Sequence, residues 1–110
     1  MPYCTDLATR LAEFCIQSHP YLEDKKMFGG IVWMLHGNMS FGIYKEWLIV
    51  RVGLENANNL LTQPHTKPMD FTGKVMKGWV MIAPAAIIDD AQFKYFVELA
   101  IDFVLTLPSK

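Results

Sequence analysis

The side chains that could bind a metal ion are few and far apart. His19 precedes a proline, His36 falls in an expected turn, and His65 lies in a proline-rich stretch. No two of them have the close spacing that places two ligands on one helix face, and no acidic residue stands beside them in a ligand pattern. We therefore expect three solvated loop histidines and no metal site.

The two cysteines, Cys4 and Cys15, also carry no sign of chemistry. If both lie near one N-terminal helix, they are about 16 Å apart along its axis, which is too far for a disulfide within that helix. Neither belongs to a Cys-x-x-Cys pair or has a histidine nearby. The expectation is two reduced thiols that pack as small apolar groups.

Nucleophilic and phosphate-binding patterns are equally weak. A Ser or Cys nucleophile needs a base and an orienting acid, but Ser18 and His19 are merely adjacent in sequence. The pair Asp89–Asp90 is explained by a helix cap. The glycines of 28–30 are not followed by the Gly-Lys-Ser/Thr of a phosphate loop, and glycine inside a strand more often marks a bulge or close backbone packing. The prediction is that the protein is not an enzyme and uses no cofactor.

A basic middle segment is the remaining candidate site. Residues 25–77 have a net charge of +4, whereas 1–24 and 89–110 have −3 and −2. If the strand ends converge, these charges form a small patch suited to a phosphate, a carboxylate or an acidic partner helix. The alternative is that the lysines keep the sheet ends solvated and block edge pairing. The candidate ligand- or partner-binding residues are Lys26, Phe28, Arg51, Asp70, Lys77 and Trp79.

Nucleic acid is not an expected partner of this domain alone, because so few cations, offset by Asp70 and Glu46, give limited phosphate affinity.

Helices are predicted at both ends of the chain. Apolar residues at helical spacing follow a cap at Thr5–Asp6, and Pro20 disfavours helical geometry in the residue before it. A second apolar stripe runs from a cap at Asp89–Asp90 to Pro108.

Between these helices the pattern changes to that of strands. Three strands at 27–35, 39–44 and 47–52, joined by short turns, predict an antiparallel meander. A short helix at 55–61, a loop at 62–68 and a fourth strand at 78–83 follow, with 69–77 ambiguous. The fold class is therefore α+β: an antiparallel sheet of four or five strands with N- and C-terminal helices packed on it, in the order α-β-β-β-(short α)-β-α.

Both faces of this sheet are expected to be apolar. Trp47, Ile49 and Arg51 share one face of the third strand, and neither this strand nor 78–83 shows the alternation of a sheet with one wet face. Two interpretations follow. Either the segment 56–78 folds over the second face, or that face or a strand edge docks a second chain. Low charge and seven methionines favour the second interpretation and predict a homodimer.

Length and composition set the remaining bounds. The 110 residues are 52% hydrophobic and 19% charged, with a net charge of −1, which predicts one domain over 1–110. No apolar run approaches a membrane span and the first residues do not resemble a signal peptide, so we expect a soluble cytoplasmic protein.

The strand region also carries a family resemblance. The run 25–30, the turn at Gly37, the strand 48–52, and the later runs 69–73 and 76–80 resemble the N-terminal domain of the TfoX/Sxy family. The likeness extends over Thr5 to Lys110. The motif positions are Lys26, Phe28, Gly29, Gly30, Arg51, Gly78 and Trp79.

The resemblance implies a curved antiparallel sheet packed against helices, similar to secretion-chaperone-like folds. Full-length relatives regulate bacterial competence and DNA uptake and add a C-terminal helical domain, which we expect this chain to lack. The family supplies no catalytic residues. The predicted function is a non-enzymatic regulatory or protein-interaction domain with an unidentified protein partner. The alternative is a domain that binds a small molecule, nucleotide or anion at the basic sheet ends.

Overall fold

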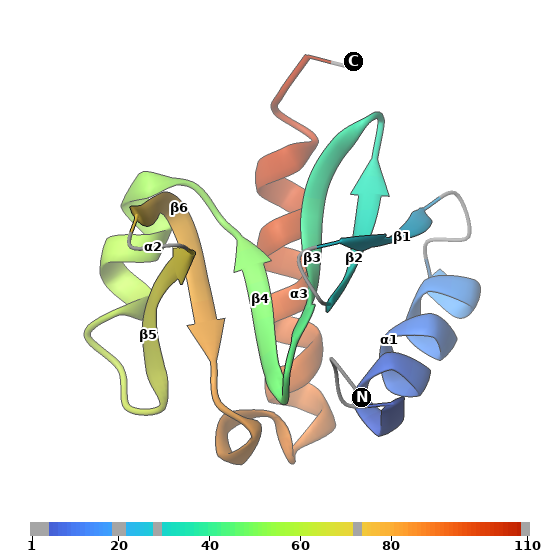
Figure 1. Ribbon diagram of the computed structural model, residues 1–110, viewed down its shortest axis with the longest axis horizontal. Helices are drawn as coiled ribbons and strands as arrows, with labels where there is room; N and C mark the ends of the chain where they lie inside the picture. Colours follow the sequence, from blue (N-terminus) through green and yellow to red (C-terminus); the bar gives the residue numbers. More distant parts are fainter. Residues whose placement is uncertain (1–4, 19–21, 28–29, 72–73, 109–110) are drawn as a thin grey trace.

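The protein is an α+β structure with one antiparallel sheet, as predicted (Figure 1). The computed structural model describes residues 5–18, 22–27, 30–71 and 74–108. Its helices are α1 (Thr5–Ser18), α2 (Leu54–Leu60) and α3 (Asp90–Val104), with a 3-10 turn, η1 (Pro84–Ile87). Its strands are β1 (Glu23–Met27), β2 (Gly30–Leu35), β3 (Asn38–Tyr44), β4 (Trp47–Arg51), β5 (Thr66–Phe71) and β6 (Lys74–Ile82).

The sheet has six strands in the order β1-β2-β3-β4-β6-β5, which is more than the four or five predicted. The single predicted strand 27–35 begins with the end of β1 and continues as β2. The predicted loop 62–68 ends in β5, which contains Pro68. A proline is tolerated there because β5 is an edge strand, so its missing N–H costs no hydrogen bond to a further strand.

All three helices pack on the same face of the sheet. Side chains from α1, α2 and α3 join the inward residues of β2, β3, β4 and β6 in one core, in which Leu11, Phe41 and Val97 are fully buried. In Figure 1, α3 lies behind β3 and β4. None of the described helices is long and apolar enough to span a membrane.

The segment 56–78 therefore does not fold over the second face of the sheet. Ala57 and Leu60 of α2 are buried in the helix-side core, and β5 extends the sheet beside β6 instead of covering it. The segment contributes to the second face only through strand side chains, Met69 of β5 and Met76 of β6, and not by folding over it.

The backbones of the paired strands β2 and β3 approach each other closely at two glycines. Gly30 and Gly42 have no side chain, and a Cβ added at Gly42 would overlap the carbonyl oxygen of Ile31 and lie 2.8 Å from the Cα of Val32. A Cβ at Gly30 would overlap the carbonyl oxygen of Ile43. Both missing side chains point away from the helices, because Ile31 and Ile43 point toward them. The close approach thus lies on the side of the sheet away from the helices.

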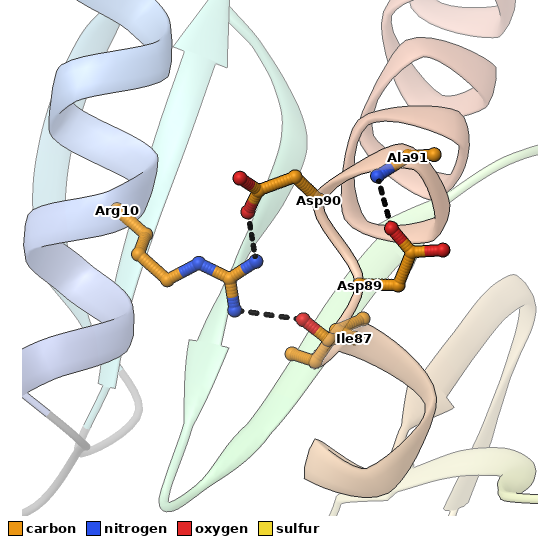
Figure 2. Close-up of polar contacts among 5 residues, drawn as sticks. All are labelled: Arg10, Ile87, Asp89, Asp90 and Ala91. Carbon is orange, nitrogen blue, oxygen red and sulfur yellow. Dashed lines mark hydrogen bonds and ion pairs between the residues drawn. The ribbon is translucent and has the colours of Figure 1, made fainter.

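A single arginine connects the first helix to the last (Figure 2). Nη1 of Arg10 donates a hydrogen bond to the carbonyl oxygen of Ile87 at 2.8 Å, and Nη2 lies 3.0 Å from Oδ1 of Asp90. The guanidinium also lies 4.2 Å from the centre of the Phe93 ring. The neighbouring Asp89 caps α3, as predicted, because its Oδ1 accepts a hydrogen bond from the backbone N–H of Ala91 at 3.0 Å.

We expect Gly42→Ala to lower the free energy of unfolding by about 1–3 kcal/mol, because β2 and β3 must separate to admit the methyl group. Urea denaturation measures the change. Gln92→Ala, on the exposed surface of α3, is the control and should stay within about 0.5 kcal/mol of the parent. Equal midpoints for the two variants would contradict the close approach of β2 and β3 at Gly42.

Replacing Arg10 tests the connection between α1 and α3. Arg10→Met should cost about 1–2 kcal/mol, because it removes the bond to a backbone carbonyl and the contact with Phe93. Asp90→Asn should cost less than about 1 kcal/mol, because the Asp90 carboxylate is exposed and solvent screens the pair. If thermal unfolding gives equal losses, the ion pair and not the carbonyl bond carries the interaction.

Candidate functional site

The helix-free face of the sheet carries a second apolar cluster. Its buried members are Val32, Ile49, Met69, Trp79 and Met81. Half-buried side chains pack against them, namely Met34, Met39, Tyr44, Trp47 and Met76. Each of these residues belongs to a strand. We call this surface the helix-free face.

Five of the seven methionines lie on this face. A bulge between Trp33 and Met34 sets Met34 opposite Met39, and Ser40 is held there by a hydrogen bond from its Oγ to the carbonyl oxygen of Trp33 at 2.7 Å. Methionine side chains are flexible and polarisable, so a surface made of them adapts to different partner shapes.

One row of residues crosses this face from edge to edge. Directly paired positions on the six strands share a face, and the pairing connects Lys25, Val32, Gly42, Ile49, Met81 and Lys67 in order from β1 to β5. The row is apolar in the middle and ends in a lysine at each edge of the sheet.

Two further cations complete a basic rim, which we define as Lys25, Lys45, Arg51 and Lys67. Lys45 follows β3 and lies over the ring of Tyr44, with Nζ 5.4 Å from its centre. Arg51 ends β4 opposite Trp79, and its Nη1 donates to the carbonyl oxygen of Met39 at 3.4 Å. Nζ of Lys67 lies 4.3 Å from the centre of the Trp47 ring. Each cation thus adjoins the apolar cluster.

The two outer strands are poorly suited to pairing with another chain. The described side chains of β1 from Glu23 to Lys26 are charged and exposed, and β5 contains Pro68. Charge and proline on edge strands oppose edge-to-edge association. The face is therefore a better contact surface than the edges.

The structure separates the residues predicted to form one basic patch. Arg51 and Trp79 are cross-strand neighbours on the helix-free face, and Trp79 is only 5% exposed. Lys77 is exposed on β6, close to Trp79 in sequence. Lys26 lies on β1, with β2 and β3 between it and β4, and it pairs with Ile31 on the helix side.

For two of the predicted binding residues the structure does not describe the side chain. Asp70, in β5, pairs with Val75 of β6, but the Asp70 side chain lies outside the described part of the structure. Phe28, like Gly29, lies outside the described residues altogether. The binding roles of the six residues stay predictions.

Sequence reasoning missed the contribution of Lys67. Its position between two prolines indicated a loop, whereas it lies in β5 and faces Trp47. The usable signal was the alternation of 47–51, which correctly set Trp47, Ile49 and Arg51 on one face.

Cys15 lies on the opposite side of the sheet. A cavity of about 440 Å³ between α1 and β2 is lined by Cys15, Leu22, Asp24 and Trp33, among others. Burial, and to a lesser extent the nearby Asp24 carboxylate, raises the pKa of the Cys15 thiol to about 12. This thiol is therefore protonated at neutral pH and is a weak nucleophile.

The histidines that the structure describes lie in turns, as predicted. His36 and His65 adopt left-handed backbone conformations, with φ of 52° and 65°. His19 lies outside the described residues. In the described part of the chain, no three His, Cys, Asp or Glu side chains gather closely enough to hold a metal ion.

The fold and the face define a class of protein: an α+β domain with helices on one side of an antiparallel sheet and an apolar, basic-rimmed surface on the other. Residues 15–104 match the TfoX N-terminal domain, and the chain belongs to this family. No curated protein and no solved structure matches the chain.

Cys15 should resist alkylation. In a Cys4→Ser background, iodoacetamide at pH 8 should modify the folded chain much more slowly than the chain unfolded in guanidinium, because burial and the raised pKa keep the thiol protonated. Since the folded pKa exceeds the unfolded one, this thiol stabilises the fold below about pH 9, and its contribution is lost as the pH rises toward 12. Mass spectrometry measures the alkylation, and Cys15→Ala should remove that part of the alkaline loss of stability. Equal alkylation rates in the folded and unfolded chains would contradict the burial.

Proposed function

We propose that this protein is a non-enzymatic regulatory domain that acts by binding another protein through its helix-free face. The observation that carries the proposal is the half-buried set of Trp47, Met34 and Met39, packed on a fully buried base and left uncovered by any described helix. Aromatic residues and methionine are enriched at protein interfaces, and a contiguous apolar surface of this kind favours association.

The half-buried side chains suit binding better than further folding. Val32 and Ile49 beneath them are each 1% exposed, so the sheet itself is already shielded from water. The surface layer retains apolar area that a partner would remove from water, at roughly 25 cal/mol per Å² before the costs of association. The domain therefore keeps its fold while the face stays free to bind.

Family membership agrees with this assignment. Residues 15–104 match the TfoX N-terminal domain, and the resemblance to the TfoX/Sxy family implies a regulatory role. A cytoplasmic location stays a prediction, based on the composition of the chain.

Two other assignments receive less support. A homodimer stays a prediction, based on low charge and methionine content, and sedimentation velocity tests it. The predicted anion site at a basic sheet end would lack Lys26, because Lys26 lies on a different strand and face from Arg51. We therefore put contact with a different protein first.

Site-specific photo-crosslinking in the native host tests the proposal. A benzophenone amino acid replaces Trp47 on the helix-free face, and a matched variant carries it at Ile88, which is 81% exposed near α3. Ultraviolet light should yield a discrete heavier adduct from position 47 and none at comparable yield from position 88. Thermal unfolding of both purified variants verifies that they fold. Equal labelling from the two positions, or none from position 47, contradicts the face as the contact surface.

A further inference from the structure

We propose that the partner bound by the helix-free face is an acidic amphipathic protein segment, whose apolar side chains lie on the methionine-rich centre and whose carboxylates meet the basic rim. This inference rests on the proposed function, because it assigns a partner chemistry to the same face.

The rim places positive charge on every side of the apolar centre. Lys25 lies on the β1 edge and Lys67 on the β5 edge. Lys45 lies at the β3–β4 turn, and Arg51 lies at the opposite end of β4. Glu23, which pairs with Met34, is the acidic residue that the described register places on this face. The face is therefore positive, although the whole chain has a net charge of −1.

The helices carry the compensating negative charge. Together α1, α2 and α3 contain six acidic and two basic residues: Asp6, Glu13, Glu55, Asp90, Glu98 and Asp102 against Arg10 and Lys94. Charge is thus segregated between the two sides of the sheet. Such segregation steers a partner of opposite charge toward one side of the molecule.

The same rim disfavours a second copy of this chain as the occupant. A two-fold dimer buries the same patch on both subunits, so face-to-face packing would bring two basic rims together. Like charges brought together at an interface are unfavourable, and Glu23 offers little compensation. Carboxylates on the partner would instead be opposite in sign at each rim position.

The width of the face sets the size of the partner segment. From Lys25 on β1 to Lys67 on β5 the row takes five inter-strand steps, or about 24 Å if the sheet were flat. A helix of about 15 residues covers such a width. Acidic residues near both of its ends would reach the two edge lysines while its apolar stripe rests on Ile49 and Met81.

The two kinds of contact contribute differently. Exposed ion pairs are weak, so the apolar centre supplies most of the affinity. The rim decides which partners bind and how strongly added salt weakens them, because exposed charges are screened within about 8 Å at physiological ionic strength. Binding at the helix-free face should therefore be selective for segments with acidic flanks, and this selectivity should decrease as salt is added.

Two synthetic peptides of 18 residues test this selectivity. Both carry the same Leu and Phe stripe at helical spacing, and their polar positions are Glu-rich in one peptide and Lys-rich in the other. Titration into the ¹⁵N-labelled protein, followed by amide shifts and fluorescence anisotropy, should show the acidic peptide binding at least 10-fold more tightly at 50 mM salt. The shifts should map to β2, β4 and β6, and the preference should shrink at 500 mM salt.

Charge reversal on the two sides of the sheet provides the matched comparison. Lys25→Glu with Lys67→Glu should abolish or reverse the preference for the acidic peptide. Lys26→Glu with Lys94→Glu changes the net charge equally, but at exposed sites on β1 facing the helix side and on α3, and should leave the preference intact.

Three outcomes would overturn the inference. Equal or tighter binding of the basic peptide at the face would refute the partner chemistry and leave the face itself standing. A dimer in sedimentation that Trp47→Glu dissolves would make a second copy the occupant. Failure of both peptides to shift the amides of β4 and β6 at millimolar concentration would reject an acidic amphipathic segment. Crosslinking from position 47 tests the proposed function separately, because the mass of the adduct distinguishes a second copy of this 12.6 kDa chain from a different protein.

Discussion

The close approach of the β2 and β3 backbones at Gly30 and Gly42 is the constraint on which the architecture depends. A side chain at either position would collide with the carbonyl of the neighbouring strand, so only glycine allows the two strands to approach this closely. The close approach lies on the side of the sheet away from the helices. On that side Val32 and Ile49 are almost completely buried although no described helix covers them, because strand side chains such as Trp47 pack against them.

The other side of the sheet is closed in a conventional way, with helices over an apolar core. The Arg10 contacts add a polar connection between α1 and the start of α3, where the backbone carbonyl of the buried Ile87 in η1 accepts a hydrogen bond from the guanidinium. Because α1, α2 and α3 all pack on this side, their acidic residues are gathered there as well. The division of charge between the two sides is thus a consequence of where the helices pack.

The functional proposal follows from this two-sided construction. On one side, helices cover the core, and burial keeps the Cys15 thiol protonated. The other side has a buried base and an outer layer of methionine and tryptophan, edged by cations. A domain of the TfoX N-terminal family with such a surface is well suited to recognise a partner by contact, with charge at the rim providing selectivity.

The sequence by itself determined the local structure. Apolar periodicity predicted α1 and α3, a carboxylate predicted the cap that Asp89 supplies, and short turns predicted the hairpins of β2, β3 and β4. These features depend on neighbours a few residues away, which the sequence displays directly. The alternation in β4 also indicated that Trp47 and Ile49 share a face with Arg51.

Only the tertiary structure decided which distant residues meet. Pro68 concealed β5 because a proline excludes a central strand but not an edge, and edge position depends on strand order. The insertion of β6 between β4 and β5 aligned Lys67 with Met81 and Ile49, while β2 and β3 separated Lys26 from Arg51. Residue type and spacing identify a lysine on a strand. Its neighbours across the sheet are set by long-range pairing, which leaves no mark in the nearby sequence.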